Sequence, residues 1–200
     1  MRILIAEDDP VIGLGLAKRV AALGHEPLGP ACDGVEAVEM ARSELPDLYL
    51  FDVDMPRLDG LAAARALTAE GLRRPVVVIT GVREPDLIDR CIADGVSAYL
   101  AKPIDDRQLD ASIRLAATRH AEFEALEAEV SKARQALDDR KLVERAKGVL
   151  MEAMSLNEPD AFKRIQRAAR NRNCSIADVA RDILQREDLL RDPTAAPPAV

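Results

Sequence analysis

The sequence predicts a doubly wound α/β domain with a parallel sheet, followed by a smaller module built only of helices. Over roughly the first hundred residues, short apolar runs alternate with longer helical patterns, as is typical of βαβ units. Beyond Pro103 the pattern becomes purely helical. The 200 residues, 48% of them hydrophobic, suffice for one full domain and a smaller one.

Five short segments rich in apolar and β-branched residues are expected to form the strands. They are residues 2–6, 28–31, 48–52, 75–80 and 98–100. Pro27 and Pro30 lie beside and within the second segment, and each lacks the N–H that a central strand donates to its neighbour. We therefore expect the second strand at an edge of the sheet.

Helices are expected between the strands, because apolar residues recur there at spacings of three and four. These segments are residues 11–22, 35–43, 61–69 and 86–93. A long helix is expected from residue 106 to about 154, a stretch whose only glycine is Gly148 and which contains no proline. Two shorter helices, about 161–172 and 176–185, complete the module. We expect the proline-rich tail to be disordered.

The long helix carries a stripe of apolar residues at alternating steps of three and four. The stripe consists of Phe123, Leu126, Val130, Ala133 and Leu137. This spacing is typical of a short coiled-coil seam and predicts a homodimer through residues 119–139. A helix that packs on its own chain accounts for the same pattern equally well.

The charge of the chain is acidic overall, with one basic exception. The 28 basic and 35 acidic residues give a net charge of −7, which argues against a nucleic-acid binder. Between residues 140 and 172, however, nine basic residues stand against four acidic ones, an excess of five positive charges. Such a basic island in an acidic protein indicates a site for a polyanion.

Cysteine usage and hydropathy exclude other classes of protein. The three cysteines are far apart and show no metal-ligand spacing, so neither a disulfide framework nor a zinc site is indicated. No apolar run approaches the roughly 20 residues that span a bilayer. We therefore expect a cytoplasmic protein with no membrane contact.

Polar residues end or follow four of the expected strands. Glu7 and Asp8 follow the first strand, Asp52 ends the third, Thr80 the fourth, and Lys102 follows the fifth. They are expected to meet, because the functional crevice of a parallel α/β sheet lies beyond the carboxyl ends of its strands. Clustered carboxylates stay ionised when a hard cation shares their site, so Mg²⁺ is expected.

This arrangement predicts a phosphoacceptor site. A metal held against Asp52 would neutralise charge while a phosphoryl group transfers to the carboxylate. Lys102 and the Thr80 hydroxyl would bind the new phosphoryl oxygens. Asp52 would then carry a transient acyl phosphate.

Four segments resemble the receiver domains of two-component response regulators. They are residues 3–10 (ILIAEDDP), 52–60 (DVDMPRLDG), 78–81 (VITG) and 99–103 (YLAKP). The resemblance covers about residues 1–118. It implies a flavodoxin-like fold with strand order 2-1-3-4-5 and a sensor histidine kinase as the phosphoryl donor.

The resemblance also implies roles for single residues. Asp8 and Asp52 would bind Mg²⁺ directly, Glu7 would act through water, and the main-chain carbonyl of Asp54 would complete the protein ligands. Thr80 and Tyr99 match the switch pair of the family, in which the hydroxyl moves to the phosphoryl group and the ring moves inward behind it. Pro103 would follow a cis peptide bond.

The helical module is similar to the ANTAR domain, an RNA-binding antitermination module. The similarity spans about residues 141–184 and depends on residues 140–151 (RKLVERAKGVLM), 161–169 (AFKRIQRAA) and 176–180 (IADVA). It implies a dimerising protein that binds paired RNA stem-loops in a nascent transcript and prevents a terminator from forming. We expect a receiver over 1–118, a connecting helix over 119–139, the ANTAR domain over 140–190 and the tail over 191–200.

The basic island supplies the expected RNA contacts, which are Lys147, Arg167, Arg170 and Arg172. Gly148 lies in a helix interior, where glycine costs about 1 kcal/mol relative to alanine. We expect it to permit close approach of a backbone or a ligand.

Two other outputs compete with RNA binding. Residues 174–180 are similar to the first helix of a DNA-binding helix-turn-helix. Alternatively, the helices bind a partner protein, and the basic island is a solvated surface. We do not expect a separate enzyme, since the helical part lacks phosphate-binding and zinc-protease motifs and His120 is its only histidine.

Overall fold

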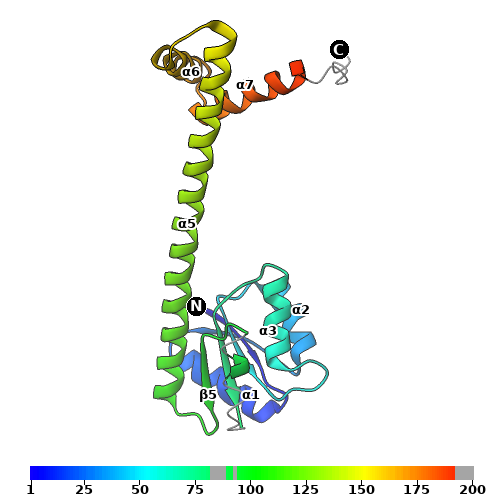
Figure 1. Ribbon diagram of the computed structural model, residues 1–200. Coiled ribbons are helices and arrows are strands. Elements are labelled where there is room, and N and C mark those ends of the chain that lie inside the picture. The colour runs from blue at the N-terminus through cyan, green and yellow to red at the C-terminus, as the bar shows by residue number, and fades with distance from the viewer. Residues whose placement is uncertain (82–88, 92–93, 192–200) are drawn as a thin grey trace. The chain divides into compact units, whose positions relative to one another are not determined.

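Five parallel strands form one sheet in the order β2-β1-β3-β4-β5. The strands are β1 (Arg2–Ala6), β2 (Glu26–Ala31), β3 (Leu48–Asp52), β4 (Val76–Thr80) and β5 (Ala98–Ala101). This computed structural model describes residues 1–81, 89–91 and 94–191, and side chains up to residue 187 (Figure 1). The predicted fold class and strand order are confirmed.

The edge strand β2 begins two residues earlier than expected. Its first residue, Glu26, pairs with Arg2, and the Glu26 N–H donates to the Met1 carbonyl at 2.9 Å. Pro27 and Pro30 are tolerated because β2 has a neighbour on one side only. Its predicted edge position is confirmed.

Each strand sends alternate side chains to opposite faces of the sheet, because successive side chains of a strand point in opposite directions. Leu4 of β1 packs in a cluster with α2 (Gly34–Glu44) and α3 (Gly60–Ala69). Its neighbours Ile3 and Ile5 pack on the other face, with α1 (Pro10–Ala22) and the first turns of α5. All residues of β3 and β4 are buried, as expected of strands covered on both faces.

An aspartate caps the N-terminus of each of the first three helices. Asp9, Asp33 and Asp59 accept hydrogen bonds from main-chain N–H groups in the first turns of α1, α2 and α3. Each helix starts one residue earlier than predicted, immediately after its cap. The helix predicted over residues 86–93 lies mostly outside the described residues, which include only 89–91 of it.

The chain divides into two compact units, residues 1–125 and 126–200, and the division falls within the helix α5 (Asp106–Met154). The predicted extent of this long helix is confirmed. None of the helices in the described part of the chain is both long and apolar enough for a membrane span.

The C-terminal unit contains the end of α5 together with α6 (Glu158–Arg172) and α7 (Ile176–Arg191). Ala146, Ile165 and Val179, one from each helix, form the centre of its core. α6 starts three residues earlier than predicted because the Asn157 side chain caps it. α7 continues past the predicted end at residue 185, and the tail predicted to be disordered lies almost entirely outside the described residues.

Candidate functional site

Three carboxylates meet at the carboxyl ends of β1 and β3. Glu7, Asp8 and Asp52 each offer an oxygen, and these oxygens lie within 4.8 Å of one another. Glu7 is 2% and Asp52 3% exposed, whereas Asp8 is open to solvent. An all-oxygen donor set that is partly exposed suits a hard cation such as Mg²⁺, which retains several waters when it binds.

Lys102 reaches this cluster from the residue after β5. Its Nζ donates to Asp52 Oδ2 at 2.7 Å and to the two Glu7 carboxylate oxygens at 2.9 and 3.1 Å. Burial raises the pKa of Glu7, and the nearby charge of Asp52 adds to this rise while Lys102 opposes it. Burial lowers the pKa of Lys102, but the bonds to Asp52 and Glu7 outweigh this effect and raise it overall. A single ammonium therefore holds two buried carboxylates together.

The loop after Asp52 is closed tightly by Gly60 at the start of α3. The N–H groups of Met55 and Gly60 both donate to the Val53 carbonyl at 3.2 Å. A Cβ at Gly60 would lie 2.0 Å from the Asp52 main-chain carbonyl oxygen, so only glycine fits there. Asp54 is exposed in this loop, and its N–H lies 3.4 Å from Asp52 Oδ1.

The expected switch residues lie on neighbouring strands. Thr80 ends β4 and is buried, and its main-chain carbonyl accepts a 2.8 Å hydrogen bond from the Lys102 N–H. Tyr99 on β5 pairs with Val78 in the sheet and leaves 50% of its surface exposed. Pro103 follows a cis peptide bond, as the family resemblance implies.

An ion pair that the sequence analysis missed fixes the other side of the loop. Arg57 donates to Asp33 Oδ2, at 2.7 Å from its Nε, and Asp33 is buried where it caps α2. Burial raises the pKa of Asp33, but bonds from Glu36, Arg57 and Val35 outweigh this effect and lower it. Asp33 was recognisable from sequence as a helix cap, but its partner lies 24 residues away.

Lys147 is not the exposed cation that an RNA contact would need. Its exposed fraction is 7%, and its Nζ lies 2.8 Å from Glu144 and 2.6 Å from Glu158. Bonds to these two carboxylates raise the pKa of Lys147. The contact with Glu158 links α5 to the first turn of α6, so the structure favours a positioning role for Lys147.

The three expected arginine contacts are all exposed on α6. Arg172 is paired with Asp182 of α7 at 2.5 Å. Arg167 and Arg170 have no ion pair with any residue that the structure describes. These two arginines can therefore meet a polyanion without first breaking an internal contact.

Gly148 is exposed, and a Cβ added there would meet no described atom within 4 Å outside its own helix. The expected close approach of a backbone is thus not found within the described chain. Gly148→Ala is expected to stabilise the C-terminal module by about 0.5–1 kcal/mol, because alanine loses less backbone entropy in a helix. Thermal unfolding followed by circular dichroism measures this gain.

If the same variant also binds RNA more weakly, Gly148 serves the ligand. A variant that is less stable than the wild type would contradict the open surroundings of Gly148.

Comparisons with known proteins match both units. The model of the response regulator receiver domain matches residues 3–114, and that of the ANTAR domain matches residues 131–184. The transcriptional regulatory protein PdtaR of Mycobacterium tuberculosis is 45% identical over 184 residues, which cover 92% of this chain and 89% of PdtaR. The response regulator MprA of Mycobacterium avium is 37% identical over 117 residues, 57% of this chain and 50% of its own length.

Solved structures are similar to the N-terminal unit. The signal receiver domain of a modulated diguanylate cyclase from Desulfovibrio desulfuricans has a TM-score of 0.55 at 32% identity, covering 59% of this chain and 94% of that domain. A receiver domain protein from Clostridium thermocellum has a TM-score of 0.57 at 23% identity, and the match covers 61% of this chain and 98% of that protein. At this identity, the similarity shows a shared fold only.

Proposed function

The chain belongs to the response regulators, with an N-terminal receiver domain and a C-terminal ANTAR domain, and we propose that phosphorylation of Asp52 controls its binding to RNA stem-loops. The observation that supports this most is the buried cluster in which Lys102 bonds both Asp52 and Glu7. A sensor histidine kinase is the proposed donor, and antitermination of transcription is the proposed output.

In the proposed reaction, a carboxylate oxygen of Asp52 attacks the phosphorus of a phosphohistidine. The new P–O bond forms as the P–N bond to the histidine breaks, and the electron pair leaves with the imidazole. Glu7, Asp8 and Asp52, with the Asp54 carbonyl, would hold Mg²⁺, which when bound neutralises charge on the transferring group. Lys102, 2.7 Å from Asp52 Oδ2, donates to a phosphoryl oxygen.

Thr80 and Tyr99 would transmit a conformational change from the phosphorylated Asp52 to the rest of the receiver. The Thr80 hydroxyl donates to a second phosphoryl oxygen, and the Tyr99 ring moves inward behind it. The half-exposed ring of Tyr99 fits the outward arrangement of the unphosphorylated state. Apart from forming and losing its own phosphate, we assign the chain no catalysis.

For the output, the exposed arginines of α6 support a polyanion partner. Arg167 and Arg170 would contact RNA phosphates, and Arg172 would add a further contact through the N–H donors that its pair with Asp182 leaves unused.

A DNA-binding output is disfavoured by the structure of α7. A helix-turn-helix that starts at residue 174 needs a turn after its first helix, but α7 runs unbroken from Ile176 to Arg191. We place the chain in the cytoplasm, because transcription and nascent RNA are found there in bacteria such as the source of its relative PdtaR.

The dependence of binding on salt separates an RNA output from a protein partner. Each phosphate contact with single-stranded RNA contributes about −0.7 to the slope of log affinity against log salt. We expect Arg170→Gln to reduce the slope by about 0.7, because it removes one such contact. Titrations with RNA at several salt concentrations measure this change. Lys132→Gln, which removes an exposed cation of α5 outside the basic island, is expected to leave the slope unchanged. Equal slopes for the wild type and Arg170→Gln would contradict the contact.

Dimerisation through α5 is the proposed link between the two domains. Leu126 and Leu137 are 59% and 54% exposed, so the seam is available to a second copy. Phe123, at the N-terminal end of the seam, is less exposed at 39%, and Arg73 already contacts its ring, with the guanidinium carbon 4.2 Å from the ring centroid. The seam proposed for the dimer therefore runs from Leu126 to Leu137.

Light scattering with and without the phosphoryl mimic beryllofluoride tests the dimer. The wild type is expected to double its mass with the mimic, because the exposed leucines are buried in the seam. A double variant, Leu126→Lys with Leu137→Lys, is expected to stay a monomer. Leu14→Lys changes a leucine of α1 that is 56% exposed and should behave as the wild type does. If the wild type keeps the mass of a monomer when the mimic is added, dimerisation through the seam is excluded.

A further inference from the structure

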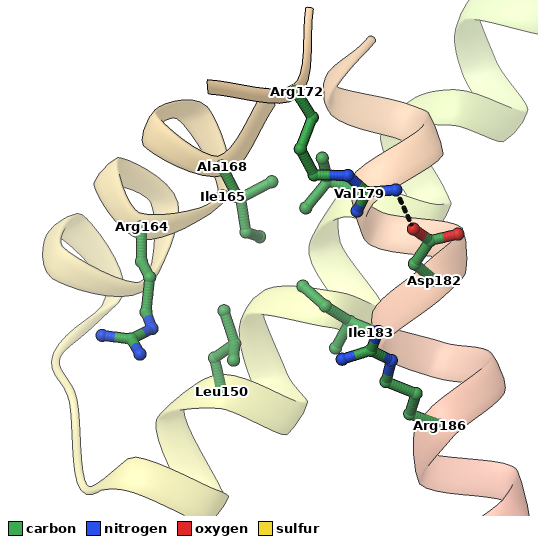
Figure 2. Close-up of a pocket in the computed structure, with 9 residues that line it drawn as sticks. All are labelled: Leu150, Arg164, Ile165, Ala168, Arg172, Val179, Asp182, Ile183 and Arg186. Atoms are coloured by element: carbon green, nitrogen blue, oxygen red, sulfur yellow. Dashed lines mark ion pairs between the residues drawn. The ribbon is translucent and has the colours of Figure 1, made fainter. Parts of the chain in front are cut away.

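A pocket of about 200 Å³ opens in the C-terminal module between the end of α5, α6 and α7 (Figure 2). Its apolar wall is formed by Leu150 of α5, Ile165 of α6 and Ile183 of α7. Ile165 also belongs to the core of the module, so the wall is held in place by packing. Pockets for drug-sized ligands measure roughly 300–1,000 Å³, which makes this one suited to a single small ring system.

Charged residues stand around the opening of this pocket. Arg164 and Arg172 come from α6, Arg186 comes from α7, and all three are exposed. Figure 2 shows them on different sides of the apolar wall, with Arg172 held by Asp182. Three guanidinium groups against one carboxylate leave an excess of positive charge, so the rim favours an anion.

The combination of an apolar wall with a cationic rim defines the chemistry of the ligand. A nucleobase has apolar faces that can lie against aliphatic side chains, and a guanidinium plane can stack on it or bond its phosphate. The aromatic residues that usually stack unpaired bases make up only 2% of this chain, so arginines are the available stacking groups. The carboxylate of Asp182 can accept a hydrogen bond from a base amino group.

We propose that this pocket takes up one unpaired base of an RNA loop together with the phosphate of its nucleotide. The inference rests on the proposed RNA-binding function and gives the ANTAR domain a site for a base, in addition to the phosphate contacts of Arg167 and Arg170. Arg164 and Arg186 hold the base and its phosphate at the rim. Asp182 fixes the guanidinium of Arg172 beside them.

The experiment uses the full-length chain with beryllofluoride and Mg²⁺. RNA hairpins with randomised loops are enriched on the wild type and then compared with blunt duplexes of the same stems. The variants are Arg164→Ala and Arg186→Ala. Two matched controls remove an exposed cation nearby without touching the pocket, Lys163→Ala beside Arg164 on α6 and Arg181→Ala on α7.

The two pocket variants are expected to lose about tenfold in affinity for the hairpins, the scale of one lost stacking contact. Their affinity for the duplexes should change no more than that of the controls, because a duplex offers no unpaired base. With an abasic nucleotide at the loop position that enters the pocket, the wild type should lose as much as the variants do, and the variants should lose nothing further.

Three outcomes would overturn the proposal, and they are distinguishable. Hairpins that bind the pocket variants and the controls equally refute the pocket while leaving RNA binding intact. A pocket variant that loses hairpin and duplex affinity alike shows a phosphate contact in place of a base site. If no hairpin is enriched on the wild type at all, the proposed function fails and the pocket inference fails with it.

Discussion

Asp52→Asn is expected to incorporate no phosphate from a sensor kinase or a small-molecule phosphodonor. The carboxamide lacks the anionic oxygen that attacks phosphorus, while its size and its place at the end of β3 stay the same. An acyl phosphate is labile to alkali and hydroxylamine, so radiolabel that these reagents remove measures the reaction at this residue.

Asp89→Asn is the matched control for this experiment. Asp89 is an exposed carboxylate of the receiver that lies outside the acidic cluster. It is expected to be labelled as the wild type is. Undiminished labelling of Asp52→Asn would place the phosphate elsewhere and refute the site.

Lys102→Gln is expected to destabilise the receiver by about 3 kcal/mol in the absence of Mg²⁺. Removing one partner from a buried ion pair leaves its charge unpaired, and here two carboxylates with exposed fractions of 2% and 3% lose the same ammonium. Added Mg²⁺ should restore more stability to this variant than it adds to the wild type, because in the variant Mg²⁺ supplies the positive charge that Glu7 and Asp52 have lost.

Denaturant titrations followed by tyrosine fluorescence measure this effect. The only two tyrosines of the chain, Tyr49 and Tyr99, both lie in the receiver, so the signal reports this domain alone. Lys18→Gln, which removes an exposed lysine of α1, should leave the stability of the receiver nearly unchanged. If Lys102→Gln is as stable as this control, the ammonium does not hold the cluster together.

The phosphoacceptor cluster was predictable because its residues stand at the ends of strands. Once Glu7, Asp52 and Lys102 are placed after strands of one parallel sheet, the sheet itself brings them together. The edge position of β2 was predictable for a similar reason, since proline cannot donate to a second neighbour.

Contacts between separate helices and strands could not be predicted from local sequence patterns. Lys147 has the spacing of an exposed basic residue, and its burial depends on Glu158 across the turn between α5 and α6. Arg57 shows no local sign of its pairing with Asp33. Arg164 and Arg186 face one pocket only because α6 and α7 pack together.

The start of some helices was predicted wrongly although the sequence carries a local signal for it. Asn157 followed by Pro159 has the spacing of a helix start, with a capping side chain and a proline in the first turn. This signal places the start of α6 at Glu158, whereas the helix was predicted to start only after Asp160. Likewise, the aspartates before α1, α2 and α3 mark each start to within one residue.

A phosphate on Asp52 is proposed to change the affinity of the ANTAR domain for RNA. The most direct test is to titrate the enriched hairpins with the full-length chain before and after phosphorylation, using the wild type and Asp52→Asn. Phosphorylation is predicted to tighten binding by the wild type and to leave Asp52→Asn at the unphosphorylated value. Equal affinities for the phosphorylated and unphosphorylated wild type would contradict the claim.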